Sequence, residues 1–85
     1  MSATTREEIR EWLKEGRNKK DITHMLVVCD TFDHQDYSTY VCRQENVRKV
    51  FNEYNFKNMQ KVMEVYSYKI SLDDQLNERR AFHFD

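Results

Sequence analysis

The stretch that decides the fold is residues 23–42, THMLVVCDTFDHQDYSTYVC, which is typical of two strands and the turn between them. It contains no Lys or Arg, and it holds both cysteines of the chain. Residues 24–32 carry apolar side chains on both alternating faces, which indicates a strand covered on both sides. Residues 37–42 are rich in Tyr, Thr and Val, which suit a pleated surface. The stretch therefore predicts a β-hairpin whose first strand is central.

The turn of this hairpin is expected at residues 33–36, because Asp side chains bond to nearby backbone N–H groups at turn starts. Such a four-residue loop would place Val28 opposite Val41. A two-residue loop inside it would place Cys29 opposite Cys42, but it would lack the glycine that tight hairpin turns favour. Both registers put the two cysteines on one face, because a shift of two residues preserves facing.

Chain length and charge limit the number of domains and the kinds of partner that can be expected. The chain has 85 residues, with 14 basic and 15 acidic side chains, so residues 1–85 are expected to form one domain that does not bind nucleic acid. A domain of this size buries only about 60–65% of its unfolded surface, which makes oligomerisation favourable. No long apolar run and no signal-peptide pattern is found, which predicts a soluble, cytoplasmic protein with reduced cysteines.

The N-terminal residues predict a helix. Thr5 and Glu8 have the spacing of a capping box, in which each side chain satisfies a free backbone N–H group of the other. Ile9 and Leu13 begin an apolar stripe, and Gly16, the only glycine, is expected to end the helix. The stretch that follows, residues 17–20, carries three basic side chains and is expected to form a solvated loop.

The second half of the chain predicts helix, strand and helix. The helix is expected over residues 44–55 and the strand over residues 61–70, with Val62, Tyr66 and Tyr68 on one face. Ser71 is expected to cap a last short helix. The aromatic end, residues 81–85, is expected to dock on the domain or on a second subunit.

These elements give a single α+β domain with the order α-β-β-α-β-α. The helix between the second and third strands suits a parallel crossover, so both strands are expected to flank the first in a sheet of order 2-1-3. An open meander of order 1-2-3 is the alternative. If the helices cover one sheet face only, the other face would form a homodimer or larger assembly through Tyr66, Tyr68, Phe82 and Phe84. In the alternative, the last helix and the tail cover that face within one chain.

The densest set of chemically capable side chains lies at the hairpin tip: Asp30, Asp33, His34 and Asp36. Carboxylates and an imidazole could hold a divalent ion, but their spacing is not that of a calcium loop. They also span a strand end and a turn, so convergence on one ion is not expected. A solvated acidic turn and a protein-binding patch are the other two interpretations, and no metal is predicted.

No catalytic set is found. A cysteine nucleophile would need a histidine beside it, and His24 lies on the opposite face from Cys29. One glycine cannot build a phosphate-cradling loop. We therefore predict neither an enzyme nor a cofactor. Tyr66 and Tyr68 could stack on a base, with Arg79 and Arg80 beside them, although such tyrosines more often pack under a helix.

The hairpin resembles small uncharacterised proteins encoded by tailed bacteriophages and prophages. The resemblance is carried by residues 23–33 (THMLVVCDTFD), by the dipeptides at 36–37 and 40–41, and by residues 58–66 (NMQKVMEVY). Together these segments cover less than half of the chain. Many of these proteins have proline where this chain has Ser38, and glycine where it has Lys20 or Asp21.

The resemblance implies a phage accessory protein that acts in the cytoplasm of the bacterial host, with no catalytic residues to carry over. The expected function is binding of a host component, for host takeover or against host defence. The tip residues Asp30, Asp33, His34 and Asp36 would face a basic surface on that host protein. The alternative is an oligomeric small-ligand binder that sequesters a nucleotide signal at Tyr66 and Tyr68. A metal-dependent hydrolase is the third and weakest interpretation.

Overall fold

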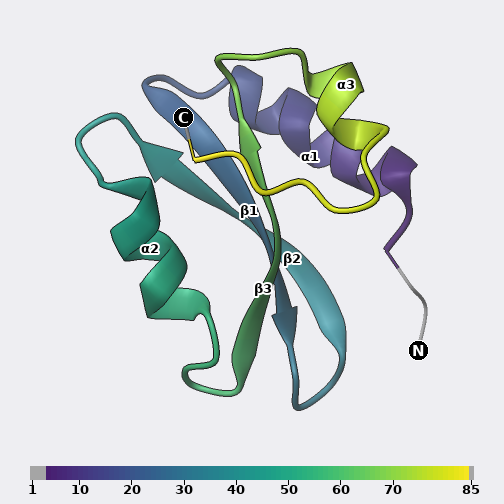
Figure 1. Cartoon of the computed structure of the whole chain (residues 1–85), viewed down its shortest axis with the longest axis vertical. Coiled ribbons are helices and arrows are strands. Elements are labelled where there is room, and N and C mark those ends of the chain that lie inside the picture. The colour runs from purple at the N-terminus through teal and green to yellow at the C-terminus, as the bar shows by residue number, and fades with distance from the viewer. Residues whose placement is uncertain (1–3, 85) are drawn as a thin grey trace.

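A three-stranded antiparallel sheet lies at the centre of the molecule, with helices on both of its faces (Figure 1). The computed structural model describes residues 4–84. Its strand order is 2-1-3, as predicted, and the meander is excluded. The elements are α1 (Arg6–Arg17), β1 (Ile22–Asp30), β2 (Gln35–Cys42), α2 (Val47–Tyr54), β3 (Gln60–Ser67) and α3 (Leu72–Leu76). Strands β2 and β3 are both antiparallel to β1 and therefore run in the same direction.

The hairpin turn begins two residues earlier than expected. Asp30 pairs with Gln35, so the four loop residues are 31–34 and both predicted registers are wrong. The backbone N–H of Phe32 donates to the Asp30 carboxylate at 2.8 Å, and this bond starts the turn. His34 ends it with a positive φ of 61°. The register between β1 and β2 differs from the prediction by an even number of residues, so the β2 side chains lie on the sheet faces predicted for them.

Strand β3 contains a bulge that the sequence pattern does not reveal. Val27 pairs with Glu64 and Val28 pairs with Val62, which leaves Met63 as the extra residue. The bulge reverses the facing of the preceding residues. Val62 consequently packs with Leu26 and Val28, on the sheet face opposite Tyr66. The prediction that Val62 and Tyr66 share a face is therefore wrong.

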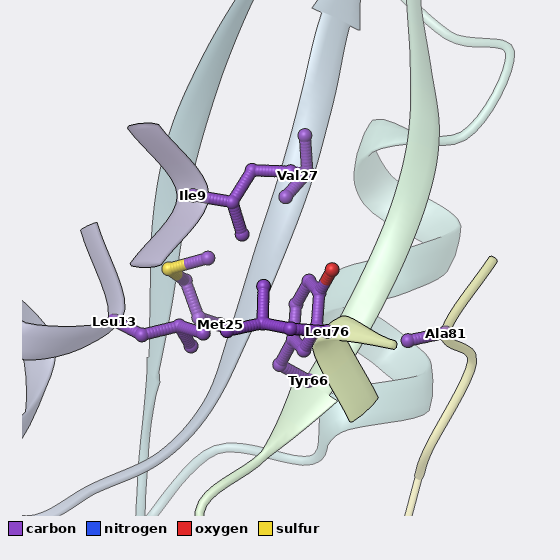
Figure 2. Packing of buried hydrophobic residues seen from close by; sticks show 7 residues of the cluster. All are labelled: Ile9, Leu13, Met25, Val27, Tyr66, Leu76 and Ala81. Atoms are coloured by element: carbon purple, nitrogen blue, oxygen red, sulfur yellow. The ribbon is translucent and has the colours of Figure 1, made fainter. Parts of the chain in front are cut away.

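Each sheet face carries its own core. On one face Met25 and Tyr66 pack under α1 and α3, as Figure 2 shows. On the other face Leu26 and Val65 pack under α2. The central strand is thus apolar on both sides because both sides are covered, as predicted. Both faces of the sheet are covered within residues 4–84, so the open face expected from Tyr66, Tyr68, Phe82 and Phe84 does not form there, and the predicted dimer through it has no support. Helix α3 and the C-terminal segment contribute to the cover within one chain.

Helix α1 begins as expected and ends later. Both halves of the Thr5–Glu8 capping box are present. The helix continues through Gly16 to Arg17, so the prediction that Gly16 stops it is wrong. The glycine is instead required by packing, because a Cβ atom there would lie 2.5 Å from Tyr40 Cε1 and would also meet the Tyr68 hydroxyl. Those two tyrosines anchor the helix through hydrogen bonds to the carbonyl oxygens of Trp12 and Leu13.

The C-terminal segment docks on the domain along the outer edge of β3 (Figure 1). Val65 N donates to Ala81 O at 2.8 Å, and His83 N donates to Val65 O at 3.0 Å. Phe84 then packs edge-on against Phe51 of α2, with ring centroids 5.3 Å apart. Asp85, the last residue of the predicted aromatic end, lies outside the described residues. Within residues 4–84, no helix has the length and apolar character needed to cross a membrane.

Candidate functional site

The hairpin tip and the loop between α2 and β3 together form a hollow of about 390 Å³. We call this feature the tip hollow. Thr31 joins its two sides, because its backbone N–H and its hydroxyl both donate to Met59 O, at 2.8 and 2.9 Å. Only the acidic half of this surface was predicted from the sequence. The lining residues are Asp30, Phe32, Asp33, Asn58 and Met59.

Two large apolar side chains of the tip hollow are exposed to solvent. Phe32 is 66% exposed and Met59 is 61% exposed, and Phe56, in the same loop as Met59, is 73% exposed. Exposed apolar side chains are ordinary when single, but two of them line one hollow here. Phe32 and Met59 could not be predicted as one surface from the sequence, because loop residues have no periodicity.

The loop that carries Met59 has an unusual backbone. Phe56, Asn58 and Met59 all have positive φ values, of 59°, 53° and 61°. Asparagine tolerates this left-handed region, whereas for Phe and Met it costs about 1 kcal/mol or more each. The loop therefore holds two apolar side chains out in water on a strained backbone. Such strain concentrates at sites of binding and function.

The carboxylates at the tip have structural as well as electrostatic roles. Asp30 accepts the Phe32 N–H, and Asp33 accepts the Gln35 N–H at 3.1 Å. No Lys or Arg among residues 4–84 forms an ion pair with Asp30, Asp33 or Asp36. The tip hollow is therefore a partly apolar surface that carries two carboxylates without an ion-pair partner among residues 4–84.

The four tip residues of the sequence analysis do not share one site. Asp30 and Asp33 line the tip hollow, whereas His34 and Asp36 line a second cavity of about 370 Å³ on the α1 side of the sheet. Within the described residues, no group of three His, Cys, Asp or Glu side chains is placed to hold a metal ion. The tip offers no convergent ligand set.

The second cavity, which we call the sheet-face cavity, has an apolar floor and a charged rim. Val27 and Met63 form part of the floor, and Arg79 and Arg80 lie at the rim. Both arginines are exposed, and neither forms an ion pair with residues 4–84. Their free guanidinium groups can attract an anion into this cavity.

Cys29 and His34 line the same cavity, but their arrangement does not activate the thiol. Cys29 Sγ donates to the carbonyl oxygen of Asp30 at 3.7 Å. Burial raises the pKa of the Cys29 thiol, and the adjacent Asp36 carboxylate raises it further. A protonated thiol is a poor nucleophile. The geometry therefore favours a resting thiol over a catalytic one.

An ion pair between a partly exposed arginine and a buried glutamate lines the same cavity. Arg6 Nη1 lies 2.9 and 3.0 Å from the two carboxylate oxygens of Glu64, which is almost completely buried. Glu64 also accepts the Tyr66 hydroxyl at 2.7 Å and the Ala81 N–H at 3.1 Å. We call this set of contacts the Arg6–Glu64 latch. It joins α1, β3 and the C-terminal segment.

The two tyrosines that the sequence analysis offered for base stacking are structural. Tyr66 is fully buried, and its hydroxyl is bonded to Arg6 and Glu64. Tyr68 is half-buried and donates to Leu13 O at 2.9 Å. Neither ring is free to stack on a ligand.

Comparisons of the chain with protein-family models, with curated proteins and with solved structures gave no match.

Proposed function

We propose that this chain is a non-enzymatic binding protein that docks on a partner protein through the tip hollow. The observation that carries the proposal is the pairing of exposed Phe32 and Met59 in one hollow beside the free charges of Asp30 and Asp33. The complementary partner surface is an apolar pocket ringed by Lys or Arg. Burying the apolar side chains would supply affinity, and the opposite charges would speed the encounter.

The backbone of the α2–β3 loop supports the same proposal. A loop selected only to connect two elements gains nothing from positive φ at Phe56 and Met59. It gains affinity if those side chains are held ready for a partner, because less ordering is needed on binding. The resemblance to phage proteins would make the partner a component of the bacterial host, met in its cytoplasm.

The experiment compares two variants that remove exposed apolar side chains. Phe32→Ser with Met59→Ser changes the tip hollow, and Ile70→Ser removes an exposed apolar side chain outside it. Immobilised wild type and Ile70→Ser should capture the same specific protein from host lysate, and the tip variant should lose it. Capture that survives the tip variant, with all three proteins folded by circular dichroism, would place the binding surface elsewhere.

A small anionic ligand in the sheet-face cavity is the second candidate function. It is favoured by the free guanidinium groups of Arg79 and Arg80 above an apolar floor. This candidate differs from the predicted stacking of a base on Tyr66 and Tyr68, because both side chains are packed and hydrogen-bonded within the domain. A thermal-shift series with nucleotides tests it, because a ligand at a hundred times its dissociation constant adds about 2.7 kcal/mol of stability. No shift for wild type, or an equal shift for Arg79→Ala with Arg80→Ala, would remove this candidate.

A further inference from the structure

Strand β2 is an edge strand whose outer side is open. It lies at the end of the β2-β1-β3 sheet, so half of its backbone groups turn away from β1. Two bonds identify which half. Arg43 N donates inward to Asp21 O at 2.7 Å, whereas Cys42 N donates to the Glu45 side chain at 2.9 Å. Because facing alternates along a strand, Asp36, Ser38 and Tyr40 turn their N–H and C=O groups outward.

This edge has little of the usual protection against pairing. Natural edge strands are protected by proline, by charged side chains, especially lysine, by bulges or by a covering segment. Strand β2 carries a single charged side chain, that of Asp36. The eight residues Gln35–Cys42 include no Pro, Lys or Arg, and within residues 4–84 no hydrogen bond reaches the outer backbone groups of Asp36, Ser38 or Tyr40. The opposite edge differs, because the C-terminal segment pairs with β3 at Val65.

We propose that the β2 edge pairs with the β2 edge of a second copy of this chain, antiparallel about a two-fold axis at Ser38. This register places Ser38 opposite Ser38 of the second copy and Asp36 opposite its Tyr40. It is the register in which all three outward residues of both copies exchange their backbone hydrogen bonds. The two sheets join into one continuous sheet, and the small serine side chains meet at the axis without a clash.

Charge selects the same register. Asp36 and Tyr40 have the same facing on β2, so the Asp36 carboxylate of one copy lies beside the Tyr40 ring of the other. Lys19 Nζ lies 5.4 Å from the centroid of that ring. Each Asp36 therefore meets the Lys19 of the second copy, and the contact occurs twice. A parallel pairing would instead bring the two acidic tips together.

The dimer does not depend on the tip hollow, and it leaves that surface open. Phe32 and Met59 lie on the β3 side of the hairpin tip, away from the β2 edge. An antiparallel dimer would hold two tip hollows at opposite ends of one rigid sheet. Two tethered sites raise the effective affinity for a partner with repeated binding surfaces.

The test uses charge reversal at Lys19 and Asp36, with mass measured by light scattering at low salt. Wild type should be a dimer, with twice the 10.5 kDa mass of the chain. Asp36→Lys alone and Lys19→Asp alone should each weaken the dimer about tenfold or more, because two attractions become two repulsions. An equimolar mixture of the two variants should recover the dimer, and so should one chain that carries both changes. Lys49→Asp on α2 is the control and should leave the dimer intact.

A second variant tests the backbone pairing. Ser38→Pro removes an outward N–H group that β1 does not use, and should give a folded monomer. A wild-type chain that remains at 10.5 kDa at high micromolar concentration would overturn the proposal. A dimer that resists both single charge reversals would also overturn it. If Ser38→Pro unfolds, the recovery of the dimer in the mixture decides the question.

Discussion

At Gly16, helix α1 passes so close to Tyr40 and Tyr68 that no side chain fits between them. Gly16→Ala should therefore lower the free energy of unfolding by about 1–3 kcal/mol through overpacking, although alanine favours a helix by about 1 kcal/mol. Urea denaturation measures the change. Glu15→Ala, an exposed neighbour in the same helix, should be nearly neutral. A more stable Gly16→Ala variant would show that the tyrosines move aside easily.

Tyr66 and Tyr68 should make the protein sensitive to alkali. Burial raises the pKa of both hydroxyls, and the adjacent Glu64 adds to the rise for Tyr66. The unfolded chain loses these protons near pH 10. Above that pH the unfolded state binds fewer protons, so stability that is fully present below pH 10 is lost as pH rises. The slope should reach about 1.4 kcal/mol per pH unit for each tyrosine.

Chemical denaturation between neutral pH and pH 11 would measure this loss, with Tyr68→Phe as the comparison. The variant should be less stable at neutral pH, because Leu13 O loses its partner. Its stability should fall less steeply above about pH 10. Equal slopes for the two proteins would mean that Tyr68 ionises in the folded state as readily as in the unfolded state.

Asp33 separates charge from turn structure at the tip. Asp33→Asn keeps an oxygen that can accept the Gln35 N–H, so the free energy of unfolding should change by less than about 0.5 kcal/mol. Asp33→Ala loses the bond and should cost about 0.5–1.5 kcal/mol. If the tip binds a basic partner, both variants should associate more slowly, and the slowing should shrink at high salt. Unchanged association rates in stopped-flow measurements would confine Asp33 to the turn.

At the level of elements, the sequence predicted all six helices and strands in the correct order. Alternation and helical spacing are local properties, so residues 24–32 and 44–55 could be interpreted without the fold. Register is not local in this way. The turn lies earlier because the Asp30 carboxylate accepts the Phe32 N–H, and the β3 bulge leaves Met63 without a partner on β1. Neither the position of the turn nor the presence of the bulge can be predicted from the composition of the strand concerned.

The C-terminal segment acts as a covering element for α2 and the β3 edge. Phe84→Ala should lower the free energy of unfolding by about 1–2 kcal/mol, less than a fully buried phenylalanine, because its ring is half-buried against Phe51. Phe82→Ala is the matched control. Phe82 is 42% exposed and lies farther from Phe51, at 6.4 Å, so its loss should be clearly smaller. Thermal melts that rank the two variants in the reverse order would contradict this account.

At the scale of the whole molecule, the sequence predicted half of the candidate site. The acidic half could be predicted from the sequence, because a cluster of charged residues is apparent without the fold. The apolar half was not, because Phe32 and Met59 are 27 positions apart in the chain and meet only when β1 and β3 pair. The pairing of β2 with β1 places Asp36 beside Cys29 in another cavity, away from Asp33. Sites assembled from loops require the fold before they can be identified.

The Arg6–Glu64 latch has a consequence for folding kinetics. It joins residues 58 positions apart, so it can close only after most of the chain has been ordered. Contacts that form after the transition state affect unfolding rather than refolding. Glu64→Gln should therefore speed unfolding about tenfold or more and leave the refolding rate almost unchanged, as a chevron plot would show. A variant that refolds more slowly would place the latch in the folding nucleus.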